Sequence, residues 1–201
     1  MMGLRDVSID IESIRAGQIS SLAGADLEGW DLRGMDFSQV SLQGSRLGGA
    51  DLRQAILRTN LQGADLTGAN LGGADLRNAN LRGAVLLGSR LVGASLAGAF
   101  LPGVVLDHLD LAGGDLRGSD LRGASLRQTS LQAADLSSSN LSGADLSGAD
   151  LEEANLGGSL LRGANLTRAN LFCAQLTGCA WEGALWDQAC LEGTILPNPY
   201  R

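Results

Sequence analysis

The chain has 201 residues and a formal net charge of −7, and all of its cationic side chains are arginines. This length is typical of one domain, and the acidic balance argues against bulk electrostatic attraction to nucleic acid or anionic membranes. Three cysteines, Cys173, Cys179 and Cys190, form neither a disulfide framework nor a metal-ligand spacing and suit a reducing compartment. Without an apolar signal-peptide core or a long apolar span, the sequence predicts a cytoplasmic protein that does not bind membranes.

Residues 1–19 differ from the rest of the chain and are predicted to form a cap with a short helix. Ser8 or Asp10 could begin this helix, and Gly17 would end it. Large residues at Trp30 and Met35, close behind, are expected to pack against the cap.

Residues 20–196 follow one pattern, which is clearest in GADLTGANLGGADLRNANLRG at 63–83. A small residue is followed by Asp or Asn, then Leu, then two variable residues, of which the second is usually Gly. Leu66, Leu71 and Leu76 are thus five residues apart. Neither an α-helix nor a straight strand keeps such leucines on one side.

A chain that bends by about a quarter turn after every pentad aims each Leu at a common axis. The sequence therefore predicts a four-sided parallel β-solenoid of about nine coils, in the all-β class. The small residue should also point inward, the Asp or Asn should hydrogen-bond nearby backbone, and Gly should supply the positive φ of a type II turn.

The phase of the repeat changes once, because Leu61 follows Leu57 after four residues. A register slip at 57–61 must therefore reshape one corner. Near the carboxyl end, Trp181 and Trp186 replace Leu, and residues 197–201 form a proline-containing tail, which together suggest a terminal cap.

Tandem A(D/N)LxG units resemble the pentapeptide repeat family, and the Leu-centred form is similar to its cyanobacterial members. The resemblance implies a right-handed β-helix. It says little about activity, since many such members have no assigned biochemistry.

Catalytic chemistry finds little support in the sequence. His108 is the only histidine, and the serines and aspartates follow the repeat instead of gathering around a base. We expect no enzyme, no cofactor and no metal site.

Two surfaces are candidates for binding. Stacking the sequence at a period of 20 places apolar residues on the outside of adjacent coils, although drift of a relaxed repeat would give the same pattern. This predicted apolar patch comprises Val85, Leu87, Phe100, Pro102, Val105 and His108. The second surface is a predicted acidic face, for which a solvated consensus face is the alternative, and it comprises Asp115, Asp135, Asp150, Glu152 and Glu153.

The leading hypothesis is a monomeric, non-enzymatic scaffold that binds another protein. A second hypothesis follows from the resemblance, since acidic rods of its quinolone-resistance branch imitate duplex DNA and bind DNA gyrase. This chain differs from that branch in its almost uniform central Leu, in having no protruding loop, and in lacking a C-terminal dimerising helix. A purely structural repeat without a specific partner is the third alternative.

Overall fold

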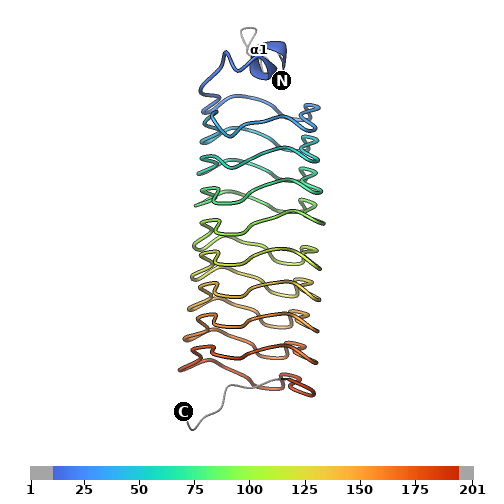
Figure 1. Cartoon of the computed structure of the whole chain (residues 1–201), viewed down its shortest axis with the longest axis vertical. Helices are drawn as coiled ribbons and strands as arrows, with labels where there is room; N and C mark the ends of the chain where they lie inside the picture. Colours follow the sequence, from blue (N-terminus) through green and yellow to red (C-terminus); the bar gives the residue numbers. More distant parts are fainter. Residues whose placement is uncertain (1–10, 195–201) are drawn as a thin grey trace.

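The fold is that of a long, narrow rod in which the chain winds around one axis (Figure 1). The structure is a computed structural model, and it describes residues 11–194. The predicted N-caps Ser8 and Asp10 and the tail at 197–201 lie outside the described residues.

One short helix, α1 (Ile11–Arg15), begins the described chain and lies at the amino-terminal end of the rod (Figure 1). Gly17 has φ +67°, its N–H donates to the Ile14 carbonyl at 3.0 Å, and the Gln18 N–H donates to the Ser13 carbonyl at 3.0 Å. This pair of bonds is a Schellman motif, so Gly17 ends the helix as predicted. Ile14 is 2% exposed and joins the core, which places the helix over the first coil.

Parallel pairing joins each coil to the next. Asp115 pairs with Asp135, and Asp135 pairs with Asn155, so that one coil takes 20 residues. The Leu116 N–H donates to the Asp135 carbonyl at 2.8 Å and the Gly118 N–H to the Ser137 carbonyl at 2.9 Å. We refer to this set of bonds between coils as the ladder.

Every side of a coil is too short to form a continuous strand. The β-structure of residues 11–194 consists only of isolated parallel bridges, because two turn residues follow each short extended segment. The predicted all-β class thus holds for the parallel pairing between coils, while long strands are absent from the described part.

The corners have the predicted turn chemistry. In a representative pentad the Ala69 N–H donates to the Leu66 carbonyl at 2.9 Å, and Gly68 has φ +66°. The carboxylate of Asp65 accepts the Thr67 N–H at 2.9 Å. The same position takes a positive φ even where the residue is not Gly, as at Gln54 and Asn78.

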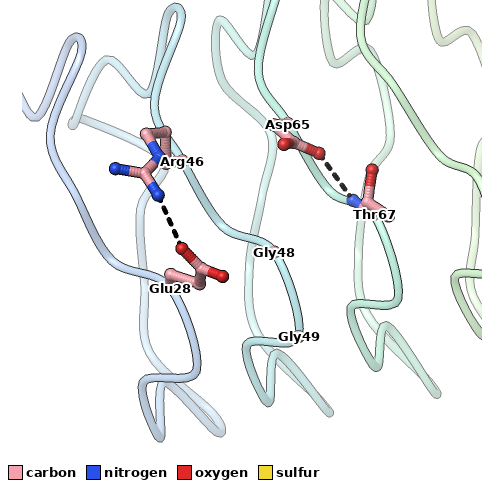
Figure 2. Close-up of a pocket in the computed structure, with 6 residues that line it drawn as sticks. All are labelled: Glu28, Arg46, Gly48, Gly49, Asp65 and Thr67. Carbon is pink, nitrogen blue, oxygen red and sulfur yellow. Dashed lines mark hydrogen bonds and ion pairs between the residues drawn. The ribbon is translucent and has the colours of Figure 1, made fainter. Parts of the chain in front are cut away.

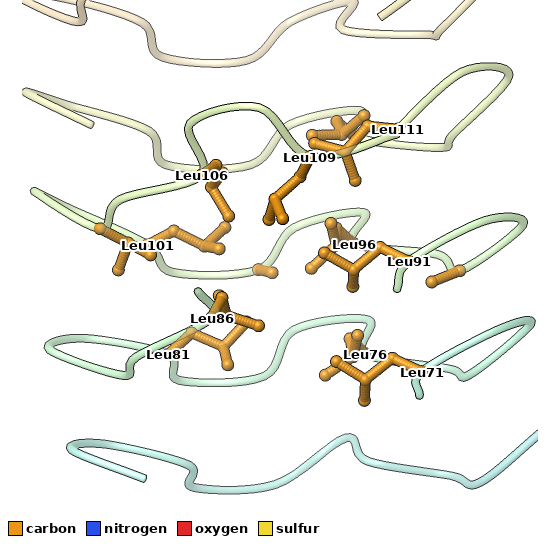
Figure 3. Close-up of a cluster of buried hydrophobic side chains, with 14 of the residues drawn as sticks. Leu71, Leu76, Leu81, Leu86, Leu91, Leu96, Leu101, Leu106, Leu109 and Leu111 are labelled. Atoms are coloured by element: carbon orange, nitrogen blue, oxygen red, sulfur yellow. The ribbon is translucent and has the colours of Figure 1, made fainter. Parts of the chain in front are cut away.

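The central leucines fill the axis of the rod (Figure 3). Leu66, Leu71 and Leu116 are fully buried, and so are the small residues Ala64 and Ala69. Inward serines satisfy their hydroxyls within their own corner, as where Ser139 Oγ donates to the Leu136 carbonyl at 2.6 Å. The lumen predicted from the repeat is therefore present.

The register slip tightens one corner. The pairing offset falls from 20 residues at Asp26–Arg46 to 19 at Arg46–Asp65. The Thr59 N–H donates to the Leu57 carbonyl at 2.7 Å, which closes a three-residue turn. Its hydroxyl donates to the Val40 carbonyl at 2.8 Å, so the shortened corner leaves that carbonyl paired.

Two indoles lie at the carboxyl end of the described core. Trp181 and Trp186 meet edge to face with ring centroids 5.6 Å apart, and both are partly buried against the core. In the described part of the chain, no helix is long and apolar enough to cross a membrane.

Candidate functional site: an open seam in the rod

Four members of the predicted apolar patch lie on one side of the rod or at its edge. The side chains of Val85, Leu87 and Val105 are 48%, 66% and 52% exposed, and His108 occupies an exposed corner with φ +62°. Phe100 and Pro102 are only half-buried and lie on the neighbouring side. The structure thus brings Val85, Leu87 and Val105 together as the centre of the patch.

The ladder is interrupted at this centre. Val85 pairs with Asp65 of the preceding coil, and Val105 pairs with Ser125 of the following coil, yet Val85 and Val105 do not pair with each other. On the next side of the same coils, Arg90 and Asp110 do not pair either. In Figure 1 the green and yellow-green coils that hold these residues stand further apart than the coils on either side.

Backbone hydrogen bonds show how far the interruption extends. Counterparts of the ladder bonds found elsewhere are missing between residues 83–94 and 102–115. Within the described chain the following backbone N–H groups therefore have no hydrogen-bond acceptor: those of Gly83, Leu86, Gly88, Leu91, Gly93, Val105, Asp110 and Asp115. The ladder resumes where the Leu96 N–H donates to the Asp115 carbonyl at 2.7 Å. We call this interruption the seam.

Two large inward residues explain the seam. Val104 and Leu109 stand at positions where the coils before and after have Ala84, Ala124, Ser89 and Thr129. Thr129 alone does not open the ladder, since the Asp150 N–H donates to its carbonyl at 3.0 Å. Both are buried, at 2% and 5% exposure, so their extra volume lies in the lumen. Figure 3 shows Leu109 pointing from its own coil toward the coil of Leu91 and Leu96. Since a close-packed lumen has no spare volume, the two coils separate on that side.

The seam opens to the surface as a cleft of about 220 Å³. Its lining is almost wholly apolar or backbone, and consists of Gly83, Ala84, Val85, Leu86, Leu87, Gly103, Val104 and Val105. Val92, which is 57% exposed, extends the apolar surface onto the next side of the same coil. An exposed apolar cluster around open backbone groups is typical of an interaction surface.

Arginines without acidic partners flank the seam. Arg82 precedes the corner at Gly83, and Arg90 follows the corner at Gly88, so the two stand on the sides adjacent to Val85. In the described chain neither guanidinium has an ion pair or a side-chain hydrogen bond, whereas Arg127, in the second coil beyond, is bound at 2.6 Å to the Asp107 carboxylate. Across the seam, Asp107 is bound to Arg127, and Asp110, the counterpart of Arg90, accepts the Ala112 N–H at 3.1 Å and forms no ion pair in the described chain. Two unpaired guanidinium groups and one unpaired carboxylate therefore lie around the cleft.

The predicted acidic face spans two adjacent sides. Asp115 and Asp135 pair along one side, Asp150 and Glu152 lie on the next, and Glu153 has φ +57° at the corner between them. Asp115 is neutralised by Arg117 at 2.8 Å, and this guanidinium lowers the pKa of the carboxyl. Asparagine amides donate to three of the others: Asn155 Nδ2 to Asp135 at 3.2 Å, and Asn170 Nδ2 to Asp150 at 2.9 Å and to Glu152 at 3.3 Å.

Most other carboxylates form ion pairs with arginines. Asp75 accepts from Arg58 at 2.5 Å and from Arg77 at 2.7 Å, and these guanidinium groups, Arg77 foremost, hold the pKa of Asp75 well below its usual range. The hydrogen bond from Arg33 lowers the pKa of Asp31 to about 2. Such carboxylates remain charged down to strongly acidic pH.

A second hollow is polar. Its volume is about 310 Å³, and it lies beside Gly48 and Gly49, between the Glu28–Arg46 ion pair at 2.6 Å and Asp65 (Figure 2). Asp65 is already bonded to the Thr67 backbone. Internal partners thus satisfy the charged groups around this hollow.

The three cysteines differ in exposure. Cys173 and Cys190 are exposed, while Cys179 is half-buried and its thiol donates to the Leu156 carbonyl at 2.9 Å. Burial raises the pKa of the Cys179 thiol. Among residues 11–194, no group of three or more His, Cys, Asp or Glu side chains could hold a metal ion.

The sequence placed Val85, Leu87 and Val105 together on the outside, and all three are exposed, but the seam beside them was not predicted. The inward residues Val104 and Leu109 were the available signal, since they break the small-residue rule in two consecutive pentads. The roles of Val92 and Arg90 could not be anticipated, because each is an ordinary outward residue until the ladder opens beside it.

A solved structure with high similarity aligns along most of this chain. HetL, a pentapeptide repeat protein involved in heterocyst differentiation regulation from the cyanobacterium Nostoc sp. strain PCC 7120, is 33% identical over 91% of this chain and 94% of its own, with a TM-score of 0.81. Its β-helix is thus the same fold. The comparison with curated proteins gave no match.

Two further solved structures are less similar. Rfr23, from the cyanobacterium Cyanothece 51142, is 28% identical over 66% of this chain and 90% of its own, with a TM-score of 0.44. The trypsin-treated fluoroquinolone resistance protein QnrB1, which is plasmid-mediated, is 17% identical over 90% of this chain and 92% of its own, with a TM-score of 0.41. Neither likeness carries an argument about function.

A family model gives the assignment directly. The model for pentapeptide repeats matches in 8 copies, at residues 20–58, 59–96, 89–123, 115–152, 129–168 and 149–184. These matches cover most of the chain and coincide with the coils of the rod. The chain belongs to the pentapeptide repeat family, whose fold is a right-handed four-sided β-helix.

Proposed function

We propose that this protein is a non-enzymatic scaffold that binds another protein at the seam. The observation that carries this proposal is that Val85, Leu87 and Val105 are exposed where the ladder is open, while the ladder is intact in the preceding and following coils. Exposed apolar side chains next to unpaired backbone groups cost free energy in a protein that is alone. A partner that covers them would recover this free energy.

The similarity to HetL supports a regulatory role for such binding. HetL is involved in the regulation of heterocyst differentiation, and it is 33% identical over most of both chains. We propose by analogy that the present protein also acts by contact with a regulatory partner and not by catalysis.

Affinity capture with matched variants tests the proposal. We expect the intact chain to retain a dominant protein from the lysate of its source organism, and Val85→Asp with Leu87→Asp to lose it. Gln175→Asp with Thr177→Asp is the control, because these exposed residues take the same two positions of a pentad on the opposite side. Equal retention by all three proteins would remove the seam as the binding site.

Inhibition or protection of DNA gyrase by DNA mimicry is the second candidate. It is favoured by Asp135, Asp150, Glu152 and Glu153, which form no ion pair in the described chain. At low salt these carboxylates would attract a DNA-binding surface. A supercoiling assay in which gyrase activity is unaffected by excess protein would exclude this candidate.

A further inference from the structure

The seam presents two backbone edges that face each other. From the first coil come the free N–H groups of Leu86 and Leu91, and from the second the free N–H of Val105. The carbonyls of Ala84 and Ser89, which would accept from the second coil in an intact ladder, are free as well. The groups of Leu91 and Ser89 lie one corner further along, so a straight segment can use only those of the Val85 side, which are the Leu86 N–H, the Ala84 carbonyl and the Val105 N–H. An extended peptide can bond to such a short edge through its own N–H and C=O groups.

The cleft beside these edges suits an aliphatic side chain. Its lining of Val85, Leu86, Leu87, Val104 and Val105 offers no charged group, and its volume of about 220 Å³ is larger than one branched aliphatic side chain. A side chain that enters it is removed from water and contacts the two valines on either side of the seam. A polar side chain there would lose its hydration without gaining a side-chain partner.

The flanking charges define the ends of such a peptide. Arg82 and Arg90 lie on the two sides adjacent to Val85, and neither guanidinium is engaged by an acid in the described part of the chain. Most other arginines of the described chain already form ion pairs, as Arg122 does with Asp120 at 2.6 Å. Carboxylates on both ends of a bound segment would therefore find free bidentate donors.

We infer that the seam binds an extended segment of a partner protein in which an aliphatic side chain stands between acidic residues. This inference rests on the proposed function and adds the chemistry of the partner. The backbone of the segment bonds to the open edge, its aliphatic side chain fills the cleft, and its carboxylates pair with Arg82 and Arg90. Such pairing also explains how an acidic protein selects an acidic segment.

Selection from random short peptides displayed on phage tests this inference. The full-length protein is the bait, and the most enriched peptide is then synthesised and titrated by fluorescence anisotropy. We expect enriched peptides to combine aliphatic and acidic residues, and their binding to weaken as salt rises. Peptides without acidic residues, or no enrichment over an unrelated bait, would overturn the inference.

Three variants locate the binding. Arg82→Glu with Arg90→Glu should weaken the selected peptide by at least about tenfold, through repulsion of its carboxylates. Val104→Ala with Leu109→Ala, the closed variant, should abolish binding by closing the seam. Leu87→Asp, which changes only an exposed side chain, should weaken binding, and it replaces the closed variant in the test if that variant fails to fold. Arg122→Glu with Arg162→Glu is the charge-matched control and should bind as the unaltered protein does.

The outcomes separate this inference from the proposed function. If Val85→Asp with Leu87→Asp loses the lysate partner while no acidic peptide binds, the seam binds a protein of different chemistry and the inference is wrong. If the selected peptide binds the closed variant as tightly as the unaltered chain, the seam is not its site. A dimer that disappears on closing the seam would assign the edges to a second copy of this chain, which also overturns the inference.

Discussion

At the scale of the residue, each position of the pentad has one task, and departures from the consensus can be assigned a cost. Gly at the corner adopts a positive φ without strain, yet Ala133 has φ 53° and Gln128 has φ 54° in the same role. A side chain with a Cβ atom in this left-handed region costs about 1–2 kcal/mol. These corners are tolerated because the ladder bonds on both sides hold them in place.

Replacing Ala133 by Gly should therefore stabilise the protein by roughly 0.5–1 kcal/mol, the relief of strain less the larger backbone entropy that Gly loses on folding. The bond from the residue 133 N–H to the Glu152 carbonyl, 2.8 Å long, is kept. Thermal unfolding followed by circular dichroism measures the effect. Ala134→Gly is the control, because Ala134 is fully buried and its loss should destabilise. A lower melting temperature for Ala133→Gly would contradict this account.

Carboxylates next to arginines make stability depend on pH. The pKa of Asp75 is lowered by Arg77 and Arg58, and that of Asp31 is lowered to about 2 by Arg33. A carboxyl whose pKa is lower in the folded state stabilises above its unfolded pKa, about 3.9. This stabilisation is lost as the pH falls through the folded pKa.

The melting temperature should accordingly be constant between neutral pH and about pH 5, and should fall below about pH 4. Asp75→Asn should cost roughly 1–2 kcal/mol at pH 7, because it removes the charged partner of two guanidinium groups. The difference from the unaltered protein should shrink toward pH 2. A difference that stays the same between pH 7 and pH 2 would show that the charge of Asp75 is not the cause.

At the scale of the element, the coil is the unit of the fold, and its spacing is set by the inward small residue. Ala, Ser or Gly at that position lets the backbones of two coils approach to ladder distance, and so does the single Thr129, whereas the ladder is open over two sides beside the consecutive residues Val104 and Leu109. Side-chain packing thus outweighs backbone hydrogen bonding at this place, since two buried aliphatic side chains hold apart a run of peptide groups.

Closing the seam is the direct test of this explanation. We expect Val104→Ala with Leu109→Ala to restore the ladder and to slow hydrogen exchange at Leu86, Gly88, Leu91 and Gly93. In the unaltered protein these amides should exchange faster than Leu126 and Gly123, which have ladder bonds of 2.7 Å and 3.0 Å. Exchange that is equally slow at both sets in the unaltered chain would show that the ladder is not open.

An interior leucine away from the seam should behave differently. Leu116 is fully buried between intact coils, so Leu116→Ala leaves a cavity and should cost about 2–5 kcal/mol. The paired substitution at Val104 and Leu109 should cost less, because the ladder it restores offsets the lost burial. Denaturant unfolding compares the two. An unchanged midpoint for Leu116→Ala would mean that this side chain does not fill the lumen.

At the scale of the whole molecule, the rod is nearly one-dimensional, since each coil contacts only the coils next to it. Its stability is then approximately a sum over coils and the interfaces between them, and the ends need protection. The amino-terminal end has it, because Ile14 of α1 covers the core at 2% exposure, with Ile11 and Ile19 packed alongside.

Ile14→Asp should therefore destabilise the amino-terminal end by roughly 2–4 kcal/mol, through lost burial and a carboxylate placed over an apolar lumen. Hydrogen exchange should accelerate in the first coils and remain unchanged around Leu141 and Leu146. Glu12→Ala is the control, since Glu12 forms only a surface ion pair with Arg15 at 3.0 Å. Acceleration spread evenly along the rod would contradict the one-dimensional description.

The sequence by itself determined the architecture. Leucines five residues apart, small residues two positions before them and Gly at the corners predicted a four-sided solenoid, and the parallel pairing and buried leucines confirm it. It also predicted the slip near Leu57 and the stop at Gly17. These features are local, because each follows from the turn chemistry and volume of a few adjacent residues.

Only the tertiary structure decided where the rod is open. In the sequence, Val104 and Leu109 are two of many departures from the repeat consensus. Whether they repack within the lumen or separate the coils depends on the space left beside them by residues about 20 positions away. The same holds for the charges, since Asp115 belongs to the predicted acidic face yet is neutralised by Arg117, while Arg82 and Arg90 form no ion pair within residues 11–194. Packing and ion pairing depend on residues that are distant in the sequence. The periodic pattern alone therefore does not show which coils separate or which charges are paired.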